Sequence, residues 1–261
     1  MSTDRTLAFS LAINEALHQM MESDPSVFLI GQGVKSPWYV GNTAQGLLER
    51  FGEDRVIDTP VSENAMTGAA VGAALAGMRP VAVHPRMDFM FYAFDPIINE
   101  AANWHYMNGG RLPVPVVFWG IINRGGEQAA QHSQALQATF AHVPGLKVVM
   151  PSTPYDAKGL MIAAIWDPNP VVFIDERWLY RLEGPVPREI YELEIGRAAV
   201  RRAGRDATLV AASYMAFEAV KAAETLSREG IDVELIDLRT IKPLDKETIV
   251  ASVRKTGRLV I

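Results

Sequence analysis

The sequence predicts an α/β protein, with a mostly parallel sheet covered by helices on both faces. Short apolar runs typical of strands alternate with segments of helical periodicity, which is the order that parallel sheets require. Residues 56–85 show this order most clearly, because they read as a strand, a sharp turn, a helix and a second strand. The length of 261 residues allows one large domain or two smaller ones.

The bulk composition excludes several classes of function. A net charge of −5 disfavours nucleic acid and anionic membranes as partners, since both attract concentrated Lys and Arg. The absence of cysteine excludes thiol catalysis, disulfides and cysteine metal sites. No stretch reaches the roughly 18 apolar residues of a membrane span, and the first residues lack the pattern of a secretory signal. A cytoplasmic protein is therefore expected.

The first part of the chain is expected to form one α/β domain without internal repeats. Strands are predicted at 26–30, 56–58, 80–83, 115–119, 145–150 and 171–174. Helices are predicted over 7–22, 43–51, 63–76 and 155–166, and a long buried helix is predicted from 89 to 101. These elements define a first domain over residues 1–180.

The rest of the chain is expected to form a linker and a second, smaller α/β domain. Residues 181–196 read as the linker, because prolines, a glycine and charged residues interrupt the pattern there. The second domain, 197–261, is predicted to begin with a hairpin between 197–202 and 207–213. Helices over 216–228 and 246–255, a strand at 233–238 and the start of another at 258–261 follow, so this domain looks incomplete.

Two side chains stand where chemistry is possible. Glu63 follows a predicted strand and begins a helix for which Ser62 is a plausible N-cap. Its carboxylate either serves only the helix dipole or faces a ligand at the carboxyl end of the sheet. His132 lies in a loop after another strand, where it is either a proton-transfer group or a structural histidine. The histidines lack metal-ligand spacing, and no serine elbow of the GxSxG type is present.

The sequence resembles the β subunit of thiamine-diphosphate-dependent 2-oxo acid dehydrogenases, the decarboxylating components of the pyruvate, branched-chain and acetoin complexes. The resemblance runs from about Leu7 to the last residue and rests on specific segments, among them DTPVSENAMTGAAVGAALAGMRPV, AQHSQAL, PGLKVV and PYDAKGL. It implies a pyrimidine-binding domain followed by a transketolase-type C-terminal domain.

The resemblance also implies roles for individual residues. Glu63 matches the glutamate that hydrogen-bonds a pyrimidine nitrogen and favours the imino tautomer, from which the thiazolium carbanion arises. Phe89 matches the aromatic ring that stacks on the pyrimidine, and His132 matches an active-site histidine that handles the substrate carboxylate and acyl transfer. Gln32, which is expected to lie at the cofactor, takes the place of a family glutamate that takes part in proton communication between paired active sites. A monovalent-cation site, with K⁺ as the expected ion, matches Val116, Ala164, Ile165, Asp167 and Asn169.

Partners follow from the same resemblance. An α subunit is expected to hold the diphosphate and its Mg²⁺, which agrees with the lack of a GDG-type motif here, and to complete an α2β2 heterotetramer. A 2-oxo acid is the expected substrate, and a lipoyl acyltransferase is the expected acyl acceptor.

Three departures from the family pattern keep alternatives open. Gln32 cannot titrate as the family glutamate does. Trp119-Gly120-Ile121-Ile122 stands where the family has an arginine and a proline-glycine stretch, which suggests an altered acyl pocket or altered docking. His84-Pro85-Arg86 replaces a more acidic or apolar segment. The alternatives are a split transketolase-like enzyme with another acceptor, and a non-catalytic assembly subunit.

Overall fold

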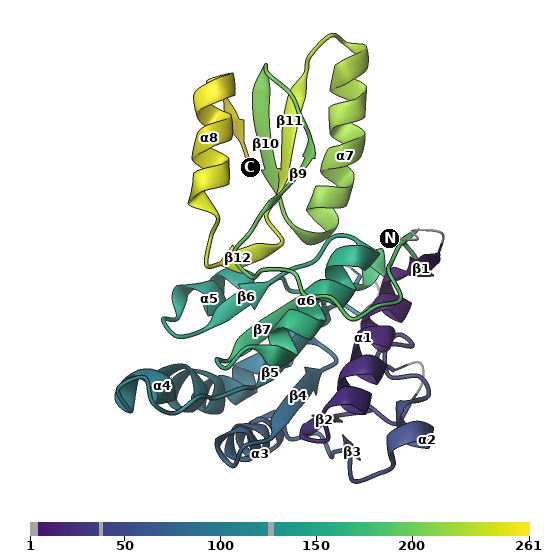
Figure 1. Cartoon of the computed structure of the whole chain (residues 1–261), viewed down its shortest axis with the longest axis vertical. Coiled ribbons are helices and arrows are strands. Elements are labelled where there is room, and N and C mark those ends of the chain that lie inside the picture. Colours follow the sequence, from purple (N-terminus) through teal and green to yellow (C-terminus); the bar gives the residue numbers. More distant parts are fainter. Residues whose placement is uncertain (1–4, 37–38, 125–127) are drawn as a thin grey trace.

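The structure is a computed structural model that describes residues 5–36, 39–124 and 128–261. A seven-stranded sheet forms the larger part of the molecule, and a smaller four-stranded unit stands at one end of it (Figure 1). The strand order in the large sheet is β12-β6-β7-β5-β4-β2-β3, and all neighbours are parallel except β12 and β6. The strands are β2 (Val27–Gly31), β3 (Val56–Asp58), β4 (Arg79–His84), β5 (Val117–Ile122), β6 (Lys147–Val149), β7 (Val171–Glu176) and β12 (Thr240–Lys242).

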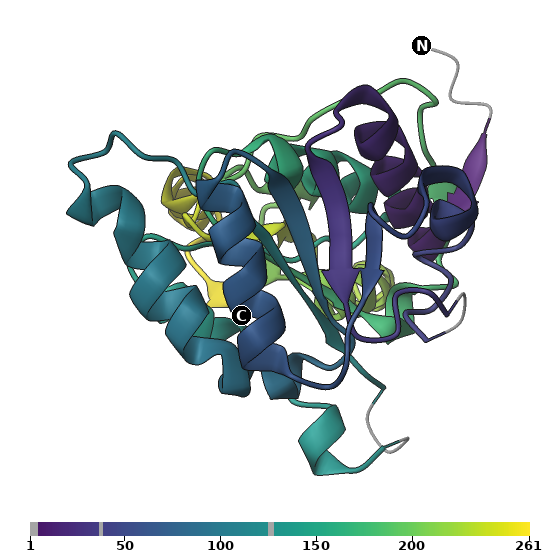
Figure 2. The ribbon, with the colours of Figure 1, turned by 90° about the horizontal axis from the view of Figure 1, so that it is seen from below.

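Helices cover both faces of this sheet, as predicted. Alternate strand residues point to opposite faces, so each face has its own apolar cluster. One face packs against α1 (Phe9–Ser23) and α6 (Pro154–Trp166), and the other packs against α3 (Glu63–Leu75) and the segment that follows β4 (Figure 2). Among the described residues no helix is long and apolar enough to span a bilayer.

The segment after β4 differs from the single helix predicted from 89 to 101. A 3₁₀ helix, η1 (Met87–Ala93), is followed by a π-helical stretch, η2 (Asp95–Ala102), and by α4 (Asn103–Met107). Pro96 explains the break, because it has no amide hydrogen for a regular helical hydrogen bond. The shorter helices α2 (Leu47–Phe51) and α5 (Gln137–His142), and the single-turn η3 (Ala130–His132), complete this part.

The smaller unit corrects one prediction about strand pairing. Its strand order is β13-β10-β11-β9, with α7 (Ser213–Arg228) and α8 (Lys246–Thr256) packed on it (Figure 1). The predicted hairpin is wrong, because β9 and β10 lie on opposite sides of β11. Gly204 carries the connection across the start of β11, where a Cβ atom would lie 2.2 Å from the Val233 carbonyl carbon. The strands are β9 (Ala199–Arg202), β10 (Ala207–Ala211), β11 (Val233–Asp237) and β13 (Leu259–Val260).

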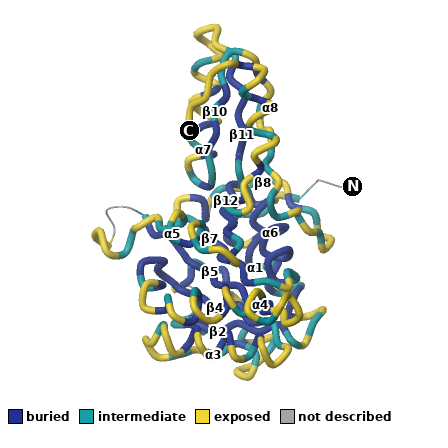
Figure 3. The backbone as a smooth tube through the Cα atoms, turned by 90° about the vertical axis from the view of Figure 1, so that its left-hand side faces the viewer, coloured by how far each residue is buried: buried dark blue, intermediate teal, exposed yellow. Residues whose placement is uncertain are grey.

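Two short strands connect distant parts of the chain. The stretch predicted as a linker contains β8 (Glu183–Pro185), which pairs antiparallel with β1 (Thr6–Ala8). After β11 the chain returns to the large sheet, where β12 pairs antiparallel with β6. Figure 3 shows the buried strands of both units and the short connection between them.

A buried ionic cluster links the smaller unit to α6. Arg201 on β9 forms ion pairs with Asp156 on α6 and with Asp237 at the end of β11, the second at 2.7 Å. Both carboxylates have no solvent exposure, and Arg239 adds a longer contact of 3.4 Å to Asp156. The Ser152 hydroxyl also donates a hydrogen bond to Asp237. The two units are thus held together by charges that need one another.

A second buried carboxyl group, Asp175, gives a prediction about pH. Burial raises the pKa of Asp175 to about 7, although the Tyr180 hydroxyl donates to the carboxyl group at 3.2 Å. The unfolded chain loses this proton near pH 4, so stability should fall between about pH 4 and pH 7, by up to about 1.4 kcal/mol per pH unit. Asp175→Asn should remove this part of the slope in denaturant titrations between pH 4 and pH 8. Asp54→Asn, at an exposed position, is the matched control, and an unchanged slope in Asp175→Asn would contradict the assignment.

Candidate active site

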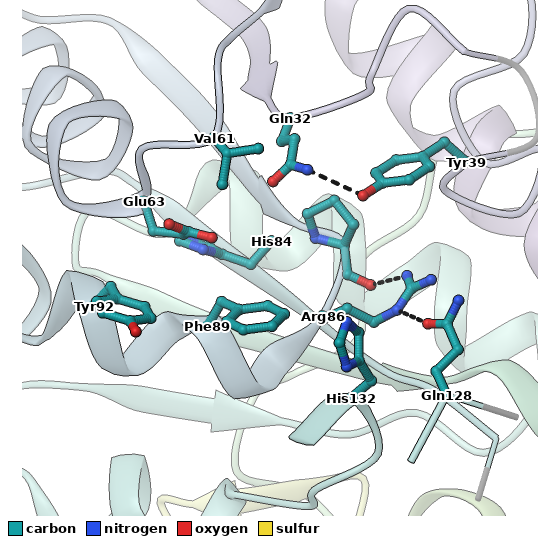
Figure 4. Close-up of a pocket in the computed structure, with 11 residues that line it drawn as sticks. Gln32, Tyr39, Val61, Glu63, His84, Arg86, Phe89, Tyr92, Gln128 and His132 are labelled. Carbon is teal, nitrogen blue, oxygen red and sulfur yellow. Dashed lines mark hydrogen bonds between the residues drawn. The ribbon is translucent and has the colours of Figure 1, made fainter. Parts of the chain in front are cut away.

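A cavity of about 460 Å³ opens at the carboxyl ends of four neighbouring parallel strands, β3, β2, β4 and β5 (Figure 4). Parallel α/β sheets place ligands at this edge, because the loops that follow the strands converge there. The lining residues come from those loops: Gln32, Tyr39, Val61, Glu63, His84, Pro85, Arg86, Phe89, Tyr92, Gln128 and His132.

Glu63 lines this cavity as the first residue of α3. The turn through Thr59-Pro60 leads from β3 directly into the helix, so the carboxylate lies at the helix start and beside the strand end. Ser62 occupies the N-cap position, as predicted, although its side chain makes no capping hydrogen bond. The Glu63 side chain is half-buried and has neither an ion pair nor a hydrogen bond among the described residues. It is thus available to a ligand.

Phe89 and His132 meet in the same cavity although 43 residues separate them in the sequence. The His132 ring packs edge-on against Phe89, with the ring centroids 5.1 Å apart and the planes at 82°. Tyr92 stacks on the other side of Phe89 at 6.5 Å. Within the described part of the chain, the buried Nδ1 of His132 has no hydrogen-bond partner. An aromatic face and an imidazole therefore border the same space.

Gln32 and Tyr39 form the wall opposite Phe89 (Figure 4). The Gln32 amide donates a hydrogen bond of 3.0 Å to the Tyr39 hydroxyl. At this position the family glutamate would be a titrating group, whereas the amide remains neutral.

His84 contributes to the cavity as a neutral group. It is fully buried at the end of β4, and its Nε2 lies 3.2 Å from the Thr67 hydroxyl. Burial lowers the pKa of His84 to about 3, so the ring carries no charge near neutral pH. His84 can therefore orient or exclude groups, but it does not supply a positive charge.

The residues matched to a cation site lie elsewhere, at the end of α6 and the start of β5. The backbone carbonyl of Ile165 accepts a hydrogen bond of 2.8 Å from Arg79, and Asp167 forms an ion pair with Lys147. Asp167 also accepts hydrogen bonds from the backbone and side-chain amides of Asn169, at 2.9 and 3.2 Å. The Val116 carbonyl accepts the amide of Val171 at 3.0 Å, and Ala164 is buried. Two cationic side chains, Arg79 and Lys147, thus already contact residues of the predicted cation site.

Trp119 does not line the cavity. Its side chain is fully buried on the face of the sheet that packs against α1 and α6, where the ring meets Phe173 edge-on at 6.4 Å. The interpretation of Trp119 as part of an altered acyl pocket or a docking surface is therefore wrong.

The sequence alone did not identify four of the residues that line the cavity, Tyr39, Arg86, Tyr92 and Gln128, as parts of the site. Arg86 and Tyr92 belong to the segment directly after β4, so the rule that ligands bind at strand ends could have indicated them. Gln128 had no such signal, because its contact with Arg86 joins positions 42 apart in the sequence.

Comparison with known proteins gives close matches along the chain. Residues 5–183 match the pyrimidine-binding domain of transketolase, and residues 196–261 match the C-terminal domain of transketolase. The chain is 48% identical to the β subunit of acetoin:2,6-dichlorophenolindophenol oxidoreductase from Cupriavidus necator, over 98% of this chain and 79% of that protein. It is 46% identical to the β subunit of the pyruvate dehydrogenase E1 component from Rickettsia conorii, over 96% of this chain and 77% of that protein. It is 44% identical to the β subunit of 2-oxoisovalerate dehydrogenase from Bacillus subtilis, with the same two coverages.

Solved structures show the same fold at lower sequence identity. A split-gene transketolase, solved as an inactive β4 tetramer, has a TM-score of 0.77 at 24% identity, over 97% of this chain and 77% of that one. Transketolase from Campylobacter jejuni has a TM-score of 0.75 at 16% identity, over 97% of this chain and 38% of that one.

Proposed function

Because the chain belongs to the family of β subunits of thiamine-diphosphate-dependent 2-oxo acid dehydrogenases, we propose that it forms half of such an active site with an α-type subunit. The complex would decarboxylate a 2-oxo acid and pass the acyl group to a lipoyl acceptor. The observation that carries this proposal is the meeting of Glu63, Phe89 and His132 around one cavity at the carboxyl edge of the sheet.

The residues around this cavity fit the pyrimidine half of thiamine diphosphate. Glu63 offers a half-buried carboxylate that can share a proton with a ring nitrogen, and Phe89 offers an aromatic surface for stacking. The bound cofactor supplies a thiazolium carbanion and an electron sink for decarboxylation. Our assignment gives Glu63 the task of holding the proton that sets the tautomer of the ring.

His132 is assigned to proton handling on the substrate side of the cavity. The Phe89 contact fixes the imidazole, and its unpaired Nδ1 can accept or donate a hydrogen bond. An imidazole suits this role because its ordinary pKa lies near physiological pH.

The diphosphate, the metal ion and the acyl acceptor are assigned to partner proteins. The α subunit would hold the diphosphate and Mg²⁺ in an α2β2 assembly, and a lipoyl acyltransferase would accept the acyl group. A monovalent cation near Val116, Ile165 and Asp167 remains a prediction from the family resemblance.

The test is co-expression with an α-type subunit, followed by assays of 2-oxo acids with an artificial electron acceptor. We expect activity that requires both chains and thiamine diphosphate, and none from the β-type chain alone. Cofactor binding without turnover of any 2-oxo acid would overturn the dehydrogenase proposal. Failure of the assembled complex to bind thiamine diphosphate in calorimetry would instead support a non-catalytic assembly subunit.

A second candidate, a split transketolase-like enzyme, is favoured by Gln32. Its neutral amide, bonded to Tyr39, cannot relay protons as a carboxylate does. Transfer to an aldehyde acceptor, together with inactivity toward a lipoyl domain, would support this candidate over the first.

A further inference from the structure

Arg86 brings a positive charge to the wall of the candidate active site. Its residue surface is only 8% exposed, and the side chain lies beside His132 in the cavity (Figure 4). Nε donates to the Gln128 side-chain oxygen at 2.6 Å, and Nη1 donates to the Pro85 carbonyl at 2.6 Å. The Tyr39 ring packs over the guanidinium at 5.8 Å. These contacts fix the side chain without using all of its hydrogen-bond donors.

None of these contacts neutralises the charge of Arg86. Gln128 and the Pro85 carbonyl are neutral, and among the described residues no carboxylate forms an ion pair with the guanidinium. The charge of Asp88 acts on Arg86 without forming an ion pair with it, and its Oδ1 accepts two hydrogen bonds from Gln134, at 2.8 and 3.1 Å. Burial lowers the pKa of Arg86 and the positive charge of Arg177 lowers it further, which the opposing effects of Tyr39, Tyr180 and Asp88 do not outweigh.

Arg86 is a buried cation that forms no ion pair with any carboxylate in the described part of the chain, which is unusual because desolvation is costly unless an anion compensates for it. Arg86 faces the cavity, so an anion that enters the cavity can offset the cost of desolvating the guanidinium. A planar guanidinium is also well matched to the two oxygens of a carboxylate.

We propose that Arg86 binds a carboxylate group of the donor substrate and makes the cavity selective for acidic donors over neutral carbonyl donors. This role rests on the proposed function, since it assigns a binding residue to the same site. The carboxylate comes from one of two sources: the C1 carboxylate that every 2-oxo acid carries, or a second carboxylate at the far end of a 2-oxo dicarboxylate.

The test compares three donors with the reconstituted α/β complex: pyruvate, 2-oxoglutarate and acetoin, which lacks a carboxylate. Arg86→Met keeps a linear, largely aliphatic stem but removes the guanidinium and its charge, and Arg86→Lys retains the charge without the planar fork. Arg111→Met, at an exposed position, is the matched control. Assembly and thermal unfolding are measured for each variant, to confirm that the complexes are intact.

We expect Arg86→Met to lower kcat/KM for acidic donors by about 10- to 100-fold, mostly through KM, and to lower acetoin turnover much less. Arg86→Lys should recover part of the loss. An equal loss for both acids identifies the C1 carboxylate, whereas a loss confined to 2-oxoglutarate identifies the far carboxylate. Binding of acetylphosphonate, an anionic pyruvate analogue that cannot be decarboxylated, is measured by calorimetry and should weaken in Arg86→Met if the C1 position is bound.

An equal loss for all three donors would overturn the inference, because it would show that Arg86 supports the subunit contact or the cofactor. Unchanged kinetics with all donors would overturn it as well. Failure of the proposed function has a different signature, since the wild-type complex would then turn over none of the 2-oxo acids while still binding acetylphosphonate more tightly than Arg86→Met does.

Discussion

Replacement of Glu63 by Gln is expected to reduce turnover of the reconstituted α/β complex by more than about 100-fold, the range typical for loss of a proton-transfer group. The amide has nearly the same size, so the cavity should keep its shape. It cannot share a proton with a ring nitrogen as a carboxylate does. The loss should therefore appear in kcat with every donor, including neutral ones, which distinguishes Glu63 from Arg86.

The control for this experiment is Glu229→Gln, an exposed position after the end of α7. It should leave kcat unchanged. Hydrogen–deuterium exchange at the thiazolium C2 position of the cofactor, followed by NMR, gives a second readout that does not require substrate. Wild-type turnover or wild-type exchange in Glu63→Gln would show that the carboxylate serves only the start of α3.

Arg201→Met is expected to lower the free energy of unfolding by about 3 kcal/mol, because two fully buried carboxylates would lose their shared counter-ion. We place the effect at the lower end of the range for buried pairs, since 26% of the Arg201 side chain is exposed and Arg239 still contacts Asp156. Denaturant titration of the chain measures the change.

Two further variants test the cause of this loss. Arg205→Met removes an exposed arginine from the same unit and should have little effect. Arg201→Met combined with Asp156→Asn should be more stable than Arg201→Met alone, because one uncompensated charge is then absent. If the double variant is less stable than the single one, packing rather than charge explains the contribution of Arg201.

The sequence allowed the parallel sheet to be predicted because its signals are local. Each strand is an apolar run, and each βα turn carries its own proline or glycine, so Glu63 could be placed at a strand end from neighbouring residues alone. The same reasoning failed for β9 and β10, since their separation depends on β11, which follows about 30 residues later. It failed also for the segment around Pro96, where a helical apolar pattern continues through a residue that cannot sustain a regular helix.

In the candidate site, too, some residues could be predicted from local sequence and others only from the fold. Glu63, Phe89 and His132 were indicated by family motifs, whereas the setting of Arg86 depends on Gln128, which is 42 residues away in the sequence. The lack of an ion pair between Arg86 and the described carboxylates cannot be recognised until its surroundings are known.

The return of β12 to the large sheet affects how the chain can be divided. Without β12, strand β6 would expose its backbone amides and carbonyls, and such an open edge invites association with other chains. A fragment that ends at the predicted boundary near residue 180 would have this unprotected edge, and Asp156 would be buried there without Arg201. The large sheet therefore reaches its final form only after the chain has been synthesised through β12, so the two units are better regarded as one cooperative folding unit.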